Sequence, residues 1–152
     1  EFERALSQAQ SRCTYVLAQP DTDYSPPIDE ACTILDWQTR VRRKKNNGID
    51  CPIDIVFLCH PNSPTGQVIS RAQFHQLYES VQRGGACLIV DEAFIDYCAS
   101  RSVLKNVGTM AGLFVLRSFT KFFAIPGLRI GYVAGPEKEV SAIRTLLPPW
   151  SG

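Results

Sequence analysis

The sequence predicts an α/β protein, a three-layer αβα sandwich built around a mainly parallel sheet. Short apolar runs such as the one at 53–59 are typical of strands that are covered on both faces of a parallel sheet. Between these runs, apolar residues recur at helical spacing, as Phe74, Leu77, Tyr78 and Val81 do. Because such strands alternate with helices along the chain, parallel connections with helices packed against the sheet are expected.

Each element follows from the local pattern of the chain. The expected elements are helices at 2–12, 29–45, 70–84 and 137–147, and strands at 14–18, 53–59, 87–90, 113–116 and 129–133. A loop rich in Asp, Ser and Pro at 20–27 separates the first strand from the second helix. That helix starts with Asp29 and Glu30 and ends in the basic run at 40–45, an arrangement that suits the helix dipole, with Gly48 as its stop.

The later elements have clearer ends. A turn at 60–66 separates one strand from a helix that Ser70 caps and that Gly84 and Gly85 end. The apolar runs that follow are short, so they are interpreted as buried strands, and the last segment returns to helical spacing.

Composition restricts the class of protein. With 152 residues, 45% of them apolar, the chain has enough material for a single domain with a packed core. Its net charge of +1 gives no electrostatic reason to expect nucleic acid or a membrane as partner. No apolar stretch is long enough to predict a transmembrane helix. The basic run at 40–45 is interpreted as a solvated helix end, because the interleaved aromatics of a nucleic-acid surface are missing.

The cysteines are expected to be reduced thiols of a cytoplasmic protein. The six are Cys13, Cys32, Cys51, Cys59, Cys87 and Cys98. No two of them form a C-x-x-C unit, and several lie in apolar runs, where a thiol packs as a small hydrophobe. A disulfide framework is unusual in a chain with a full core. His60 and His75 lack neighbours at ligand spacing, so no metal site is expected.

One segment and one strand end have the chemistry of a cofactor site. Lys121 follows the hydroxyls of Ser118 and Thr120, Arg129 comes eight residues later, and Asp91 closes an apolar run thirty residues earlier. A lysine amine forms a Schiff base with an aldehyde, and a carboxylate keeps a pyridine nitrogen protonated. A guanidinium and hydroxyls bind phosphate. The order and spacing of these residues predict a site for pyridoxal 5′-phosphate.

The fold prediction brings three separate regions to the same place. Asp91, the turn at 60–66 and Ser118 each follow the carboxyl end of an expected strand. Ligands of open α/β sheets bind beyond these ends. We therefore expect the three regions to meet at one edge of the sheet.

The chain resembles fold-type I pyridoxal phosphate enzymes of the aminotransferase class I/II group. The motifs responsible are 91–96 (DEAFID), 116–122 (LRSFTKF), 124–129 (AIPGLR) and 148–151 (PPWS). The resemblance covers essentially the whole chain, but only the central part of such an enzyme's large domain. Phe94, the sequence Ala-Ile-Pro-Gly at 124–127 and the Pro-Trp-Ser motif at 149–151 resemble the branch of threonine-phosphate decarboxylases of cobalamin synthesis. These enzymes are close relatives of histidinol-phosphate aminotransferases.

The resemblance implies a role for each candidate residue. Lys121 would bind the cofactor covalently and later move the proton on the substrate carbon. Asp91 would pair with the pyridinium nitrogen, and Ser118, Thr120 and Arg129 would hold the phosphate.

The turn departs from the family pattern at one position. Residues 61–66 resemble the family's Pro-Asn-Asn-Pro-Thr-Gly, whose second asparagine bonds the phenolic oxygen of the cofactor. Here that position is Ser63, and Asn62 precedes it. Many relatives also have a tyrosine donor where this chain has Phe94. Asn62 and Ser63 are both candidates for the missing bond.

The resemblance also implies partners and missing parts. A phosphorylated amino acid would be the substrate, and a homodimer with the site near its interface would be the assembly. An N-terminal flank with a ring-stacking aromatic and a C-terminal small domain with a carboxylate-binding arginine would lie outside the chain. The isolated 152 residues are therefore expected to be inactive alone.

Parts of the sequence also fit other functions. Asp91 and Glu92 also suit the Mg²⁺-binding strand end of a nucleotide hydrolase, but no G-x-x-x-x-G-K-[ST] loop is present, and no G-x-G-x-x-G follows a strand. Glu92 is instead expected to be structural, and Phe122 and Phe123 to belong to the core. Decarboxylation and transamination stay open, because the groups that orient the substrate lie mostly elsewhere. A structural fragment without cofactor is a third alternative, which would give no visible absorption band with added pyridoxal phosphate.

Overall fold

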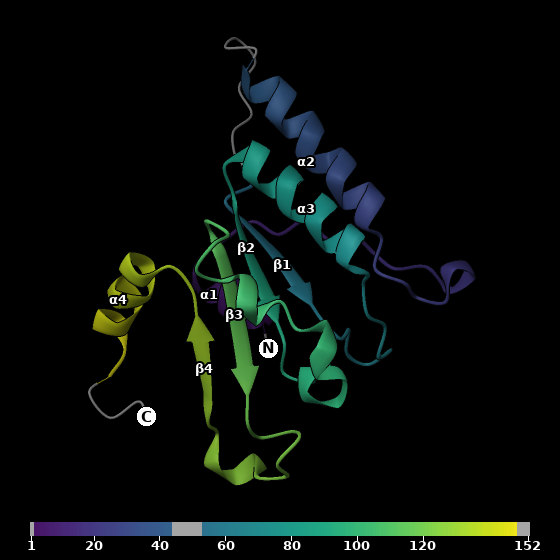
Figure 1. Cartoon of the computed structure of the whole chain (residues 1–152). Coiled ribbons are helices and arrows are strands. Elements are labelled where there is room, and N and C mark those ends of the chain that lie inside the picture. The colour runs from purple at the N-terminus through teal and green to yellow at the C-terminus, as the bar shows by residue number, and fades with distance from the viewer. Residues whose placement is uncertain (1, 44–52, 149–152) are drawn as a thin grey trace.

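The sheet has four strands whose order follows the chain. The computed structural model describes residues 2–43 and 53–148 (Figure 1). Its strands are β1 (Ile55–Cys59), β2 (Cys87–Asp91), β3 (Leu113–Ser118) and β4 (Gly131–Ala134), in the order β1-β2-β3-β4. The β1–β2 and β2–β3 pairs are parallel and the β3–β4 pair is antiparallel. The predicted α/β class with a mainly parallel sheet is confirmed.

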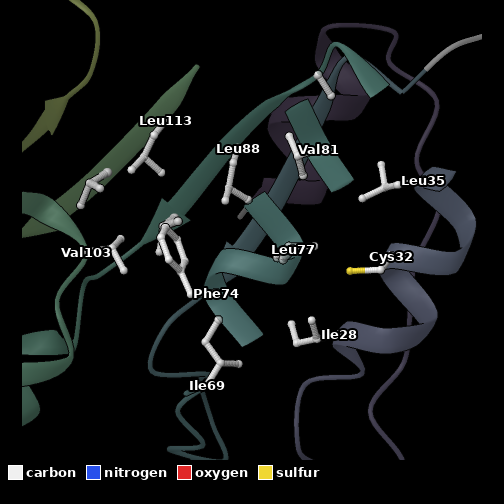
Figure 2. Close-up of a cluster of buried hydrophobic side chains, with 13 residues drawn as sticks. Ile28, Cys32, Leu35, Ile69, Phe74, Leu77, Val81, Leu88, Val103 and Leu113 are labelled. Carbon is white, nitrogen blue, oxygen red and sulfur yellow. The ribbon is translucent and has the colours of Figure 1, made fainter. Parts of the chain in front are cut away.

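The α-helices are α1 (Phe2–Gln8), α2 (Ile28–Arg43), α3 (Arg71–Gly84) and α4 (Glu137–Leu146). Of these, α2 and α3 pack together on one face of the sheet. Figure 2 shows Leu77 and Val81 of α3 between Leu88 of β2 and Leu35 of α2, all in one buried cluster. Leu88 and Val81 are fully buried. Each such aliphatic side chain contributes about 1.5–3 kcal/mol by leaving water.

The ends of α3 explain why the helix starts and stops where predicted. The Ser70 side chain accepts a hydrogen bond from the Gln73 backbone N–H at 3.2 Å, and the Gln73 side chain accepts one from the Ser70 N–H at 2.9 Å. This capping box satisfies two N–H groups that the helix cannot. Gly85 ends the helix with φ 71°, which glycine adopts without steric cost.

The opposite face of β1 is partly exposed. Ile55 and Phe57 are 53% and 37% exposed, whereas Val56 and Leu58, which point the other way, pack against the buried cluster. The layer that was expected on this side leaves these two side chains partly accessible to solvent. The α4 helix has no buried residue.

Two predictions about the fold are wrong. Residues 14–18 form no strand, and Tyr15 and Leu17 are more than half exposed. Their alternating pattern lacked the partner strand that a ladder requires. The expected core residues Phe122 and Phe123 are 45% and 53% exposed, because the segment after β3 lies beyond the end of the sheet.

Other differences concern boundaries. The first helix ends at Gln8, and Gln10 has φ 54°. The last strand begins at Gly131, because Arg129 has a left-handed backbone with φ 47°. The predicted stop at Gly48 lies outside the described residues. Sequence periodicity missed the four short 3₁₀ helices at 20–22, 95–101, 104–106 and 126–128.

Composition also predicted reduced cysteines and no transmembrane helix. Within the described ranges, the five cysteines are free thiols, and Cys51 lies outside those ranges. Across residues 2–43 and 53–148, every helix is too short or too polar to cross a bilayer.

Candidate cofactor site

The three regions predicted to converge do meet at the carboxyl edge of the sheet. Cys59, which ends β1, pairs in register with Asp91, which ends β2. The next residue, His60, donates its backbone N–H to the Asp91 carbonyl at 2.8 Å. Parallel register therefore places the start of the 60–66 turn beside Asp91.

The Asp91 carboxylate is half-buried and close to a lysine. Its Oδ1 accepts a hydrogen bond from the Ala93 N–H at 2.9 Å. Burial raises the pKa of Asp91 above its ordinary value, while the Ala93 N–H and the charge of Lys121 lower it. Desolvation is the largest of these effects, so the carboxylate lacks full compensation for its charge.

Lys121 lies on the segment between β3 and β4, with its ammonium over an aromatic ring. Its Nζ is 5.6 Å from the ring centroid of Phe94, a contact that attracts the cation to the face of the ring. Phe94 follows Asp91 by three residues. The last residue of β2 thus provides the carboxylate near Lys121, and the segment after β2 provides the ring.

Two hydroxyls precede Lys121 and bond each other. Ser118 Oγ and Thr120 Oγ1 are 2.7 Å apart, and the Thr120 N–H donates to Ser118 Oγ at 3.3 Å. Ser118 pairs in register with Gly131, so the chain brings Arg129 back to the same end of the sheet. The Arg129 side chain is exposed.

The 60–66 turn contributes its backbone more than its polar side chains. The Asn62 Nδ2 donates to Thr65 Oγ1 at 2.8 Å, so this amide is bonded within the turn, and Ser63 is exposed. The pKa of Cys59 is raised by burial, lowered by the backbone of Ser63 and raised by the charge of Asp91. The Cys59 thiol therefore lies between the turn and Asp91, although sequence reasoning did not single it out.

A second cluster next to the site was also missed. Glu92 is fully buried, and its carboxylate accepts hydrogen bonds from the Ser102 hydroxyl at 2.7 Å and the Val103 N–H at 2.6 Å. Arg117 Nη1 lies 3.7 Å from Glu92 Oε2 and 3.5 Å from Asp96 Oδ1. The sequence signal for this cluster was the acidic Glu92 just after β2 and the basic Arg117 near the end of β3.

A small cavity shares His60 with the 60–66 turn but lies on the side of α3. It has a volume of about 120 Å³ and lies at the start of α3, with His60, Ser70 and Arg101 among its lining residues. Ligand pockets usually measure about 300–1,000 Å³. Neither Asp91 nor Lys121 lines it.

The described residues give no support for a metal site. Within 2–43 and 53–148, no three His, Cys, Asp or Glu side chains are grouped in a way that could hold a metal ion. The candidate groups at this end of the sheet are the carboxylate of Asp91, the amine of Lys121 and the hydroxyls of Ser118 and Thr120, with the exposed Arg129 on the chain that returns there.

A sequence comparison gives the family of the chain. The profile described as "Aminotransferase class I and II" matches residues 12–151. The chain belongs to this family, whose members are pyridoxal phosphate enzymes.

Two relatives have named activities. A threonine-phosphate decarboxylase of Pseudomonas aeruginosa is 39% identical over 99 residues, which cover 65% of this chain and 30% of that protein. A histidinol-phosphate aminotransferase of Shigella flexneri is 33% identical over 121 residues, which cover 78% of this chain and 32% of that protein. The chain thus spans about a third of the length of the curated relatives that it matches.

A solved structure agrees with the fold. The histidinol-phosphate aminotransferase of Clostridium acetobutylicum superimposes with a TM-score of 0.80 over 98% of this chain and 40% of that one. Its sequence identity is 24%, so the comparison concerns the fold alone.

Proposed function

We propose that the chain is the cofactor-binding part of a pyridoxal phosphate enzyme that decarboxylates a phosphorylated amino acid, threonine phosphate. The observation that supports it most is the pair of Asp91 and Lys121 at the carboxyl edge of the sheet, close enough for the lysine charge to act on the carboxylate. The activity, substrate and partners belong to a longer protein, since the relatives are about three times the length of the matched part.

The residues at this edge fit the cofactor. Among the described residues, Asp91 Oδ1 has one donor, Ala93, and Oδ2 has no donor, so it has room for a pyridinium N–H. Ser118, Thr120 and Arg129 supply two hydroxyls and a guanidinium, the donor types that bind a phosphate dianion. When bound, the protonated pyridine ring accepts the electrons that are released at the substrate carbon.

Each residue then has a definite task. Lys121 Nζ is the nucleophile that attaches the cofactor, and as a free amine it moves the proton at the substrate carbon. Asp91 keeps the ring nitrogen protonated by its charge. Ser118, Thr120 and Arg129 would hold the phosphate.

The missing bond to the phenolic oxygen is assigned to Ser63. Asn62 already donates to Thr65, whereas the Ser63 side chain is exposed and its backbone contacts Cys59, the register partner of Asp91. We further propose a cytoplasmic homodimer, in which the site lies near the interface.

A second candidate reaction is transamination of a histidinol-phosphate-type substrate. The aminotransferase relative aligns over 78% of the chain, compared with 65% for the decarboxylase, although its identity is lower. A protein of the relatives' length that contains this chain would distinguish the two. Release of CO₂ from threonine phosphate supports decarboxylation, and transfer of the amino group from histidinol phosphate to a 2-oxo acid contradicts it.

The cofactor assignment is tested on the 152-residue chain. The chain is incubated with pyridoxal phosphate, reduced with borohydride to make any attachment permanent, and mapped by peptide mass. Attachment is expected at Lys121, to be lost in Lys121→Ala and kept in Lys138→Ala, which changes an exposed lysine on α4. Equal attachment at Lys105, Lys121 and Lys138 would contradict a preformed site. A chain without any visible absorption band would favour the structural-fragment alternative.

A further inference from the structure

We infer that Glu92 and Arg117 are positioning residues that hold the segment supporting Lys121. We call residues 93–103 the support loop and residues 119–124 the lysine segment. The inference rests on the proposed function and deepens it, because it concerns how the amine is kept opposite Asp91.

Glu92 closes the support loop at both ends. The loop begins at the residue after Glu92, and it ends where the Ser102 hydroxyl and the Val103 N–H donate to the same carboxylate. The Ile95 N–H also donates to the Glu92 carbonyl, at 3.2 Å. Glu92 directly follows β2 and is tied to the sheet, because its N–H donates to the Leu116 carbonyl of β3 at 2.9 Å. Hydrogen bonds to a buried charge are among the stronger ones in proteins, so this closure is firm.

Arg117 ties the same loop to two strands. It lies on β3, its side chain is 15% exposed, and its Nη1 faces both Glu92 and Asp96. Its Nε donates to the Tyr132 hydroxyl of β4 at 3.4 Å. One guanidinium thus faces two carboxylates, and neither distance is short enough for a hydrogen bond. The pairing depends on charge, which makes it sensitive to neutralisation of either carboxylate.

The lysine segment rests on the support loop through two contacts. Lys121 Nζ lies over the Phe94 ring, and Phe122 meets Tyr97 edge to face with ring centroids 5.2 Å apart. The start of the segment is held by the sheet side, because Thr120 is buried and the Phe119 N–H donates to the Ile130 carbonyl at 3.1 Å. Residues 121–124 are all exposed, so burial in the core does not fix this part of the segment. The position of Lys121 and Phe122 therefore depends on the two aromatic rings that the support loop presents.

The network also separates the two roles of neighbouring acids. Asp91 ends β2 and Glu92 follows it directly, yet their carboxylates accept hydrogen bonds from different groups. Asp91 faces Lys121, whereas Glu92 points into the protein and organises the loop. A single strand end therefore provides both the charge for the cofactor and the anchor of the lysine's support.

The test compares Glu92→Gln with Glu79→Gln in the 152-residue chain. The first change keeps the shape and most of the hydrogen-bonding capacity of Glu92 but removes its charge. The second neutralises an exposed glutamate on α3. Hydrogen exchange is measured in the support loop and in the lysine segment, well below the unfolding temperature. We expect exchange in both segments to rise at least about tenfold in Glu92→Gln, in keeping with the loss of charged hydrogen bonds, and to stay unchanged in Glu79→Gln.

A second variant covers the case in which Glu92→Gln does not fold. Asp96→Asn changes a side chain that is 27% exposed and leaves the bonds of Glu92 to Ser102 and Val103 intact. A smaller rise of about threefold in both segments is expected, because one partially exposed ion pair is weaker. Faster exchange in the support loop alone, with the lysine segment unchanged, would overturn the inference.

A chemical readout distinguishes positioning from a general loss of stability. After reduction with pyridoxal phosphate present, the ratio of attachment at Lys121 to that at Lys138 is expected to fall at least about fivefold in Glu92→Gln, as the amine leaves its place. A merely stabilising role would leave this ratio unchanged in the folded protein. If the unmodified chain shows no preference for Lys121, the proposed function fails, while coupled exchange in the two segments would still support the positioning role.

Discussion

Replacement of Asp91 by asparagine should stabilise the chain without cofactor at neutral pH. The carboxylate is half-buried, and burial raises its pKa more than the Ala93 N–H and Lys121 lower it. The amide of asparagine can accept the same bond from Ala93 and has no charge to desolvate. Incompletely compensated burial of a polar group costs about 1–3 kcal/mol. Because Asp91 keeps one hydrogen bond and an attractive lysine, we expect the lower end, a gain of about 1 kcal/mol, or roughly 2–4 °C in Tm.

The size of this effect changes with pH in a defined way. The folded-state pKa of Asp91 lies above its ordinary value of 3.8, so the folded chain holds this proton more tightly than the unfolded chain. Below pH 3.8 both states are protonated and the variant should gain little. As pH rises through the raised pKa, the wild-type chain loses this stability and the advantage of Asp91→Asn reaches its full value.

Urea unfolding followed by circular dichroism at pH 3 and pH 7 measures the difference. Asp54→Asn is the matched control, since Asp54 is exposed, and its free energy of unfolding should change by less than about 0.5 kcal/mol. A variant Asp91→Asn that is less stable than the wild type at pH 7 would refute the reasoning, because it would mean that Ala93 and Lys121 overcompensate the burial. With saturating pyridoxal phosphate the order should reverse, since the ring nitrogen then pairs with the carboxylate.

Three further outcomes follow from the geometry. Gly131→Ala should lower the free energy of unfolding by about 1–3 kcal/mol in urea titrations, since a Cβ there would collide with the Arg117 carbonyl, and an unchanged midpoint would contradict this close approach. Ser70→Ala should cost about 1 kcal/mol by the same assay through loss of the helix cap, and a change below 0.3 kcal/mol would argue against the capping box. In mass-mapped alkylation at pH 7, Cys59 should react more slowly than exposed Cys13, and its rate should rise with pH because burial raises its pKa; equal rates at pH 7 would contradict this burial.

The sequence was most informative where one local rule determined the structure. The four strands of the sheet are short apolar runs with polar or glycine boundaries, and each was located to within two residues. The start of α3 at Ser70 was readable because a capping box involves only neighbouring residues. The positions of Asp91 and Ser118 at strand ends followed in turn, because parallel strands end at the same edge.

The remaining features depend on contacts between residues far apart in the chain. Residues 14–18 have the alternation of a strand, but pairing requires a partner that the pattern does not specify. The network of Glu92 and Arg117 joins residues 25 positions apart, and only the fold makes them neighbours. The hydrogen bond from Asn62 to Thr65 also depends on the geometry of the turn, which the sequence pattern does not specify.

The order of the strands has a consequence for synthesis of the protein. Each strand pairs with the one made just before it, so β1-β2-β3-β4 is both the order in space and the order of translation. Chain segments generally begin to fold as they leave the ribosome, and contacts between segments close in the chain form fastest. The edge of the sheet can therefore be built from one side to the other, with the turn after β1 present first, Asp91 second and Lys121 last. On this view, the nucleophilic amine meets the carboxylate only after the strand that presents the carboxylate has already been secured.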